Sequence, residues 1–327
     1  MKFISNLKKI ALVLSLVVGA IACNDDDDDV IIIETNTIAD FVSENADYSS
    51  LNAALEAADL KIVLDGNAKY TVFAPNNAAF SAFLDTNGFA NLSEVPVPVL
   101  TQILLNHVQA GAIKAANLST GYIESSATGA ASDENLSIYI NTEDGVRING
   151  VSSVTIADIE VDNGVIHAVN AVIGLPDITT FALADPEFTT LVAALTAATD
   201  ESIDFVSTLQ TQTSPPAPFT IFAPTNQAFT DFLTEKDFAD LAAIPVDVLQ
   251  SVLKYHVVTG VNVRSEDITD GIEVTTFEGG KFTINTGTDV TITDENGGES
   301  TVIATDVQAT NGVIHVIDTV LFPNLED

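Results

Sequence analysis

The sequence predicts an α+β fold that is built twice in tandem. The segment Asn163 to His167 recurs as Asn311 to His315, and each copy continues as an apolar, β-rich stretch to a proline, Pro176 or Pro323. Within each copy, apolar residues at helical spacing come first, and alternating β-branched and polar residues follow. Helices followed by antiparallel strands in one unit are typical of an α+β domain.

The two copies keep an almost constant separation along the chain. Three landmarks recur at an offset of 148 or 149 residues: Phe73-Ala74-Pro75 with Phe222-Ala223-Pro224, His107 with His256, and His167 with His315. An offset constant to one residue over this length indicates duplication of one domain. We assign residues 35–176 to the first domain and 177–324 to the second, and we expect each to fold independently.

Helical periodicity is expected at three places in each domain. The apolar positions of an opening helix pair are Ile38, Phe41, Leu51 and Leu55 in the first domain and Phe181, Phe188, Leu191 and Leu195 in the second. After each Phe-Ala-Pro strand a helix begins, capped by Asn76 or Thr225, whose side chains can accept hydrogen bonds from free backbone N–H groups. A third helix carries His107 or His256 on its apolar stripe.

Strands and turns are expected in the second half of each domain. Residues 117–161 and 267–308 alternate β-branched and polar residues, which predicts hairpins. The pairs Asn163-Gly164 and Asn311-Gly312 are expected to form turns, because both residue types tolerate a positive φ. The second domain is nine residues longer ahead of its Phe-Ala-Pro strand, and we place this insertion around Gln212 to Pro218.

These segments resemble the fasciclin (FAS1) family, whose landmarks are TVFAPTNxAF, a YHV segment and a closing ATNGVIHxIDxVLxP. Here they stand at Thr71 to Phe80, Thr220 to Phe229, Tyr255 to Val257 and Ala309 to Pro323, the last being almost identical to the pattern. The resemblance covers roughly residues 35–324. It implies that each domain is a β-wedge or β-sandwich decorated with helices.

Residues 1–22 are typical of a secretory signal peptide. A basic start precedes the apolar run Ile10 to Ala22, which is short for a transmembrane helix. Cys23 is the single cysteine of the chain, and the sequence around it is similar to a bacterial lipobox, with Ala20 where leucine is usual. We expect Cys23 to be lipidated, and an ordinary signal peptide with an incidental cysteine is the alternative.

Residues 23–34 are predicted to form an acidic tether. The five aspartates Asp25 to Asp29 repel one another and cannot form a core. An acidic run behind a lipidated cysteine resembles a signal for export to the outer face in some Gram-negative lipoproteins. We expect a lipid anchor in the outer membrane with the chain facing the cell exterior, and a periplasm-facing chain is the alternative.

The chain is strongly acidic, with a formal net charge of −35, and loss of the three lysines in residues 1–22 would make it −38. Such a surface repels phosphate backbones and anionic lipid, so nucleic acid is not expected as a partner. Contact with a membrane is expected only through the lipid anchor.

All four histidines lie within the repeat, on apolar stripes of helices or strands. This setting predicts that His107, His167, His256 and His315 are buried, neutral imidazoles that tie backbone segments together. A metal site or a general base is the alternative.

The usual catalytic motifs are absent from the sequence, including Gly-x-Ser-x-Gly, His-Glu-x-x-His and the Walker loop. The acidic turns 143–145 and 294–297 lack the spacing of a calcium loop, and we expect ordinary hairpin turns there. Catalytic residues, metals and cofactors are therefore not expected, although calcium binding by these turns stays open.

The family resemblance adds candidate adhesion residues. In animal members, an Asp-Ile pair and a Tyr-His segment are implicated in integrin-dependent adhesion. The pairs in this chain are Asp158-Ile159 and Asn106-His107 in the first domain and Asp306-Val307 and Tyr255-His256 in the second. We therefore take Asp158, Ile159, Tyr255 and Asp306 as candidates, and we expect Asp158, Tyr255, Asp306 and the prolines of the insertion to be exposed.

The tether, the tandem repeat and the lack of catalytic motifs predict a non-enzymatic surface lipoprotein. Its function would be adhesion to cells, matrix or polysaccharide. The alternative is a periplasmic or surface binding module for a polysaccharide or small ligand. An enzyme would need a carboxylate or histidine site that none of these motifs describes.

Cys23→Ala is expected to convert a membrane-anchored protein into a soluble one, because each buried acyl CH₂ contributes about 0.8 kcal/mol to membrane binding. Detergent phase partitioning of the expressed chain measures this. Equal partitioning of the variant and the natural chain would mean that lipidation at Cys23 is not the anchor.

Overall fold

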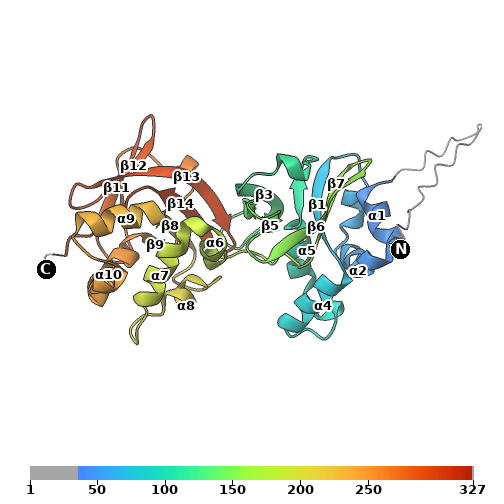
Figure 1. Ribbon diagram of the computed structural model, residues 1–327, viewed down its shortest axis with the longest axis horizontal. Coiled ribbons are helices and arrows are strands. Elements are labelled where there is room, and N and C mark those ends of the chain that lie inside the picture. The colour runs from blue at the N-terminus through green and yellow to red at the C-terminus, as the bar shows by residue number, and fades with distance from the viewer. Residues whose placement is uncertain (1–35, 326–327) are drawn as a thin grey trace, which may run out of the picture. The chain divides into compact units, whose positions relative to one another are not determined.

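A computed structural model describes residues 36–325 of the chain (Figure 1). The signal peptide predicted at 1–22, Cys23 and the tether predicted at 23–34 lie outside the described residues. Both repeats have the same order of elements, three α-helices, one strand, two α-helices and then the six strands that complete a seven-stranded mixed sheet, so the predicted α+β class is confirmed. Across residues 36–325, the helices are too short or too polar for any of them to span a bilayer.

In the part of the chain that the structure describes, five α-helices belong to each repeat. Those of the first are α1 (Ile38–Glu44), α2 (Ser49–Ala57), α3 (Lys61–Leu64), α4 (Asn77–Thr86) and α5 (Val97–Leu105). Those of the second are α6 (Ile178–Ala184), α7 (Thr189–Ala197), α8 (Phe205–Leu209), α9 (Asn226–Glu235) and α10 (Val246–Tyr255). The predicted caps are present, since Asn76 Oδ1 accepts from Ala79 N at 2.9 Å and Thr225 Oγ1 from Ala228 N at 3.2 Å.

The sheets repeat strand for strand. The first contains β1 (Tyr70–Pro75), β2 (Val108–Ala110), β3 (Gly121–Thr128), β4 (Asn135–Asn141), β5 (Arg147–Ile148), β6 (Ser152–Val161) and β7 (Gly164–Val169), in the order β2-β1-β7-β6-β5-β4-β3. The second contains β8 (Phe219–Pro224), β9 (Val257–Thr259), β10 (Ile272–Thr275), β11 (Lys281–Thr286), β12 (Val290–Thr293), β13 (Glu299–Ala309) and β14 (Gly312–Ile317), in the order β10-β11-β12-β13-β14-β8-β9. Of these strand pairs, β1–β7 and β8–β14 are parallel and the others are antiparallel.

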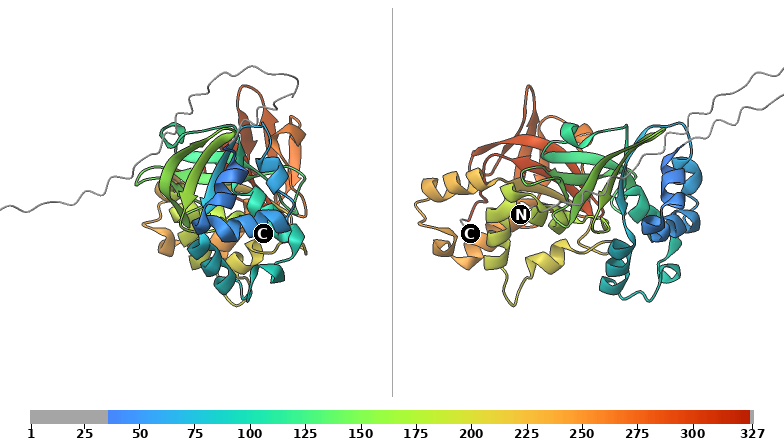
Figure 2. Two further views of the ribbon diagram at one scale, coloured as in Figure 1. Left: turned by 90° about the vertical axis from the view of Figure 1, so that its right-hand side faces the viewer. Right: turned by 45° about the vertical axis from the view of Figure 1, so that its right-hand side comes forward.

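Each parallel pair separates two apolar layers, because alternate residues of a strand point to opposite faces. Figure 2 shows the helices of each repeat gathered beside its strands. On β1, Val72 and Ala74 pack with the helices, whereas Phe73 packs against Ile138 and Ile140 of β4. The second repeat shows the same division, with Phe222 among strand residues and Ile221 and Ala223 among helical ones. A sheet that folds back over its own central strands is the sandwich implied by the sequence.

The turn predicted at each Asn-Gly pair is present, at residues 162–163 and 310–311, but it does not use the positive φ that Asn and Gly tolerate. Neither Asn163 nor Gly164 has a positive φ. Gly164 is required because a Cβ there would lie 2.0 Å from the carbonyl oxygen of Tyr70 on the paired strand. At Gly312 the same contact would be 2.3 Å, to Phe219 O. The glycines thus permit close packing of two parallel strands rather than a left-handed turn.

The asparagine of each pair joins three backbone segments. Asn163 Oδ1 accepts from Ile38 N, the first residue of α1, at 2.8 Å, and its Nδ2 donates to Leu64 O and Gly66 O at the end of α3. In the second repeat, Asn311 makes the equivalent bonds to Ile178 N, Leu209 O and Thr211 O. One buried amide therefore fixes two helices to the strand that ends the domain.

The nine-residue insertion is split in two, which the sequence did not indicate. Leu64 and Leu209 are equivalent through these asparagine bonds and lie 145 positions apart, whereas the helices α2 and α7 begin 140 apart and the strands β1 and β8 149 apart. Five extra residues therefore precede α8 and four follow it. The loop before β8 is also partly anchored, because Ala217 is buried and the carbonyls of Pro216 and Pro218 accept from Gly260 N.

The two repeats share packed residues, so the expectation of fully independent domains needs correction. Tyr139 of β4 is buried within the apolar cluster of the second repeat. Tyr122 lies edge-on to Phe181, and its hydroxyl donates to Asp185 Oδ2 at 2.9 Å. Ser137 Oγ accepts from Gln308 N at 3.0 Å. Separating the repeats would expose these groups to water.

Gly164→Ala is expected to destabilise the protein by about 3 kcal/mol or more, because the new Cβ forces the parallel strands apart. Gly174→Ala is the matched control in the same closing segment. No atom lies within 4 Å of the place that a Cβ would take there and its φ is not positive, so its effect should stay within about 1 kcal/mol. Urea unfolding measures both, and equal stability of the two variants would contradict the close-packing argument.

Candidate functional site

The two helix histidines are buried and fully bonded to backbone. His107 Nδ1 lies 2.7 Å from Ile103 O, one turn earlier in α5, and its Nε2 accepts from Ile173 N at 2.9 Å. In the second repeat, the imidazole of His256 bridges Val252 O and Leu321 N in the same way. Because each ring donates from Nδ1 and accepts at Nε2, the neutral tautomer satisfies both nitrogens.

Each of the two strand histidines bridges a loop, after β2 or after β9, and the neighbouring strand, β6 or β13. His167 Nε2 lies 3.0 Å from Ile113 O, and its Nδ1 accepts from Asp158 N at 3.2 Å. His315 has the same relation to Val263 O and Asp306 N, at 2.9 and 3.5 Å. All four histidines are at most 3% exposed, so their predicted burial is observed.

Asp158 and Asp306 occupy an irregularity of β6 and β13 that the sequence did not indicate. Each has a positive φ, 60° and 63°, next to a register shift against the neighbouring strand. Aspartate tolerates this conformation better than most residues with a side chain. In this conformation the carboxylate reaches the segment that follows β2, where Asp158 Oδ1 accepts from Ala115 N at 2.7 Å.

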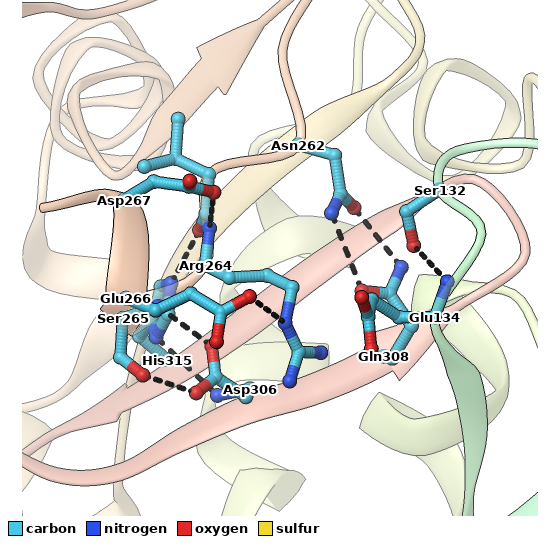
Figure 3. A network of polar contacts seen from close by, with 11 residues as sticks. Ser132, Glu134, Asn262, Arg264, Ser265, Glu266, Asp267, Asp306, Gln308 and His315 are labelled. Atoms are coloured by element: carbon cyan, nitrogen blue, oxygen red, sulfur yellow. Dashed lines mark hydrogen bonds and ion pairs between the residues drawn. The ribbon is translucent and has the colours of Figure 1, made fainter.

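The second repeat extends this arrangement into a polar network (Figure 3). The Asp306 carboxylate accepts from the backbone N of Ser265 at 2.8 Å and also from its hydroxyl. Arg264 lies beside them, and its Nε is 3.9 Å from Glu266 Oε1. Ser, His and Asp meet here without the order of a catalytic triad, because the serine bonds the aspartate and both imidazole nitrogens are occupied by backbone.

The electrostatics of the network favour a neutral imidazole beside a carboxylate. Burial lowers the pKa of His315, and the hydrogen bond to Val263 O and the charge of Asp306 offset this only in part. Burial alone would raise the pKa of Asp306, but the hydrogen bonds from Ser265, with His315 and Arg264 nearby, bring the net pKa below its ordinary value. The arrangement stabilises the fold and leaves no free base.

The exposure predicted for the adhesion candidates is wrong for Tyr255. Its side chain is 0% exposed, its ring packs edge-on to Phe282, and its hydroxyl donates to Lys281 O and accepts from Glu295 N. Burial raises its pKa. Asp158, Ile159 and Asp306 are half-buried, with Ile159 packed against the core of the first repeat. An adhesive role for these four residues stays a prediction, and their contacts are those of structural residues.

The carboxylate of the acidic turn at 294–297 is bonded by backbone N–H groups. Asp294 Oδ1 accepts from Asn296 N and Gly298 N, at 2.9 and 2.7 Å, and its Oδ2 accepts from Phe322 N. Among residues 36–325, no three His, Cys, Asp or Glu side chains are grouped as metal ligands.

Comparison with known proteins identifies the family. The model of the Fasciclin domain matches twice, at residues 46–176 and 186–323. These two segments cover most of the chain, which therefore belongs to the fasciclin domain family, as the sequence motifs predicted.

Relatives include bacterial and animal proteins. A Synechocystis sp. protein, sll1735, is 35% identical over 147 residues, which are 45% of this chain and 98% of the relative. Human periostin is 28% identical over 301 residues, 88% of this chain but 31% of periostin. A solved FAS1 domain pair from the insect cell adhesion molecule Fasciclin I is 19% identical with a TM-score of 0.48, covering 86% of this chain and 98% of that one.

Acidification is expected to destabilise the protein between about pH 6.5 and pH 4. Burial, partly offset by the bond to a helix carbonyl, lowers the pKa of His107 and of His256 to about 4. An unfolded histidine titrates near 6.5, so the unfolded chain binds more protons in this window and stability falls as the pH falls. The loss is about 3 kcal/mol for each histidine.

Urea unfolding at several pH values tests this, with His256→Gln as the comparison. The variant is less stable at neutral pH, but its stability should fall less steeply on acidification because one titrating group is gone. Identical slopes for the variant and the natural chain would contradict the assignment. Carboxylates with lowered pKa values, such as Asp306, act only below this window.

Proposed function

We propose that this protein is a non-enzymatic adhesion lipoprotein that uses tandem fasciclin domains to attach to cells, matrix or polysaccharide. Fasciclin domains occur in cell adhesion proteins, and the insect Fasciclin I pair is one of them. The observation that carries the proposal is the duplicated domain itself, whose signature histidines serve the fold. With both ring nitrogens bonded to backbone, these residues support a scaffold rather than a reaction.

The proposed location is the outer membrane, with a lipid anchor at Cys23 and the domains facing the cell exterior. The sequence of residues 1–34 supports this, and a periplasm-facing binding module for a polysaccharide or small ligand is the alternative. The large negative charge restricts the partners, because anionic surfaces are repelled and the contacts must come from neutral or cationic groups.

The folded protein, coupled to beads, is expected to be retained on an array of matrix proteins and polysaccharides. Asp306→Ala is expected to lower retention only in proportion to its loss of folded protein, because the carboxylate holds Ser265. Thermal melting of each variant supplies the correction. A well-folded Asp306→Ala variant without retention would instead make Asp306 a contact residue.

Two results would contradict the proposal as a whole. The first is no retention of the folded natural chain on any surface of the array. The second is hydrolysis of any substrate in a hydrolase panel, if that activity persists with a chelator present and disappears when the protein is unfolded.

A further inference from the structure

The same groove exists in both repeats, but only the first repeat leaves it open. In the first repeat it lies between α4, α5, the β5–β6 turn and the closing segment after β7, with Thr180 of α6 also lining it, and its volume is about 650 Å³. In the second repeat the equivalent space beside α9 and the β12–β13 turn is about 160 Å³. Volumes of 300–1,000 Å³ are typical of ligand sites.

The open groove contains no charged side chain, although the chain is strongly acidic. Four positions that line the groove are uncharged in the first repeat and charged in the second. They are Ala82, Thr86, Asn87 and Val151, which correspond to Asp231, Glu235, Lys236 and Glu299. Val99 and Val151 remain 44% and 61% exposed at its rim. An uncharged, apolar groove of this size is a candidate binding site.

The second repeat shows what such a groove accommodates. Its own Phe322 lies there, with the ring 5.8 Å from that of Phe232 and 4.8 Å from Lys236 Nζ. Asn296 Nδ2, from the β12–β13 turn, donates to the backbone carbonyls of Phe322 and Pro323 at 2.7 and 3.2 Å. The space is thus filled by an aromatic side chain of the closing segment, and the backbone of that segment is bonded to the turn.

The first repeat lacks this internal occupant for two reasons. Gly174 stands at the position of Phe322, because the backbone N–H groups of the preceding residues, Ile173 and Leu321, make equivalent bonds to His107 and His256, so the first repeat has no side chain there. The turn is also shorter, since three residues separate Ile148 from its strand partner Ser152, whereas seven separate Ile292 from Ser300. The turn therefore does not extend over the groove.

The shorter turn nevertheless presents an amide. Asn149 lines the groove and is 3% exposed, and its Oδ1 accepts from Tyr139 N at 2.8 Å. Its Nδ2 has no hydrogen-bond partner among the described residues. A buried donor without a partner is costly, and a bound acceptor would remove that cost.

We propose that the open groove of the first repeat binds an extended peptide segment of a partner protein. An aromatic side chain of the segment enters between Phe83 and Val99, and a backbone carbonyl accepts from Asn149 Nδ2. This specifies the adhesive contact and so rests on the proposed function. A polysaccharide fits less well, because its hydroxyls would lose hydrogen bonds to water against the apolar walls.

The probe is a fluorescent hexapeptide with the chain's own closing sequence, Thr-Val-Leu-Phe-Pro-Asn, residues 319–324. Its twin carries alanine in place of phenylalanine. Anisotropy titration of the full chain is expected to show saturable binding of the first peptide and at least tenfold weaker binding of the twin.

Two variants close the groove and one serves as the control. Leu175→Phe puts a larger side chain at a position that lines the groove, and Val99→Glu places a charge at its rim. Both should abolish binding. Val97→Glu is the matched control, because Val97 is 52% exposed on the same helix but does not line the groove, and it should bind as the natural chain does.

Equal peptide affinity for Val99→Glu, Leu175→Phe and the natural chain would overturn the proposal, as would no saturable binding to the natural chain. Saturable binding of free indole without peptide binding would assign the groove to a small ligand instead. Dimerisation in sedimentation, lost in Val99→Glu, would assign it to a second copy. Bead retention is measured in parallel, so retention without peptide binding refutes the groove alone, and peptide binding without retention refutes adhesion alone.

Discussion

The buried amide of Asn163, and its equivalent Asn311, is the interaction on which each domain depends. It bonds the start of the first helix and the end of the third, and it precedes the strand that pairs in parallel with the Phe-Ala-Pro strand. An unpaired buried amide would cost more than a typical surface contact contributes, so these segments are fixed together. The following glycine allows the two strands to approach closely enough for this.

The buried histidines, like the asparagine amides, fix distant backbone segments to one another. Each connects two backbone segments that are 52 to 66 residues apart in the chain, such as Ile173 with the end of α5. A neutral imidazole suits this position because it offers one donor and one acceptor on a rigid ring. Residue types that are common in catalysis therefore serve here as structural links.

The two repeats share these asparagine and histidine contacts and differ mainly in their turns and closing segments. The four-residue difference between the β5–β6 and β12–β13 turns and the presence of Gly174 at the position of Phe322 leave one groove open and the other filled. At Asp306 the second repeat adds Ser265 and Arg264, where the first has Ala115 and Lys114. Duplication of a stable domain permits such divergence, because the contacts that maintain the fold lie elsewhere.

Much of the fold could be predicted from the sequence, because periodicity and caps are local properties. The helix faces, the Asn76 and Thr225 caps, the hairpins and the burial of the histidines all follow from spacing over a few residues. The duplication and the family also follow from the sequence, since they require only that motifs recur in order.

Other features depend on residues that are distant in the chain, and only the tertiary structure decided them. Tyr255 was expected at the surface from its motif, but β11 and the β12–β13 turn cover it. The turn at Asn163 was predicted, but the close packing at Gly164 and the amide bonds of Asn163 were not, because Tyr70 and Leu64 lie more than ninety positions earlier. The loss of charge along α4 relative to α9 is readable in the sequence, but that these positions line one groove is a matter of packing between segments.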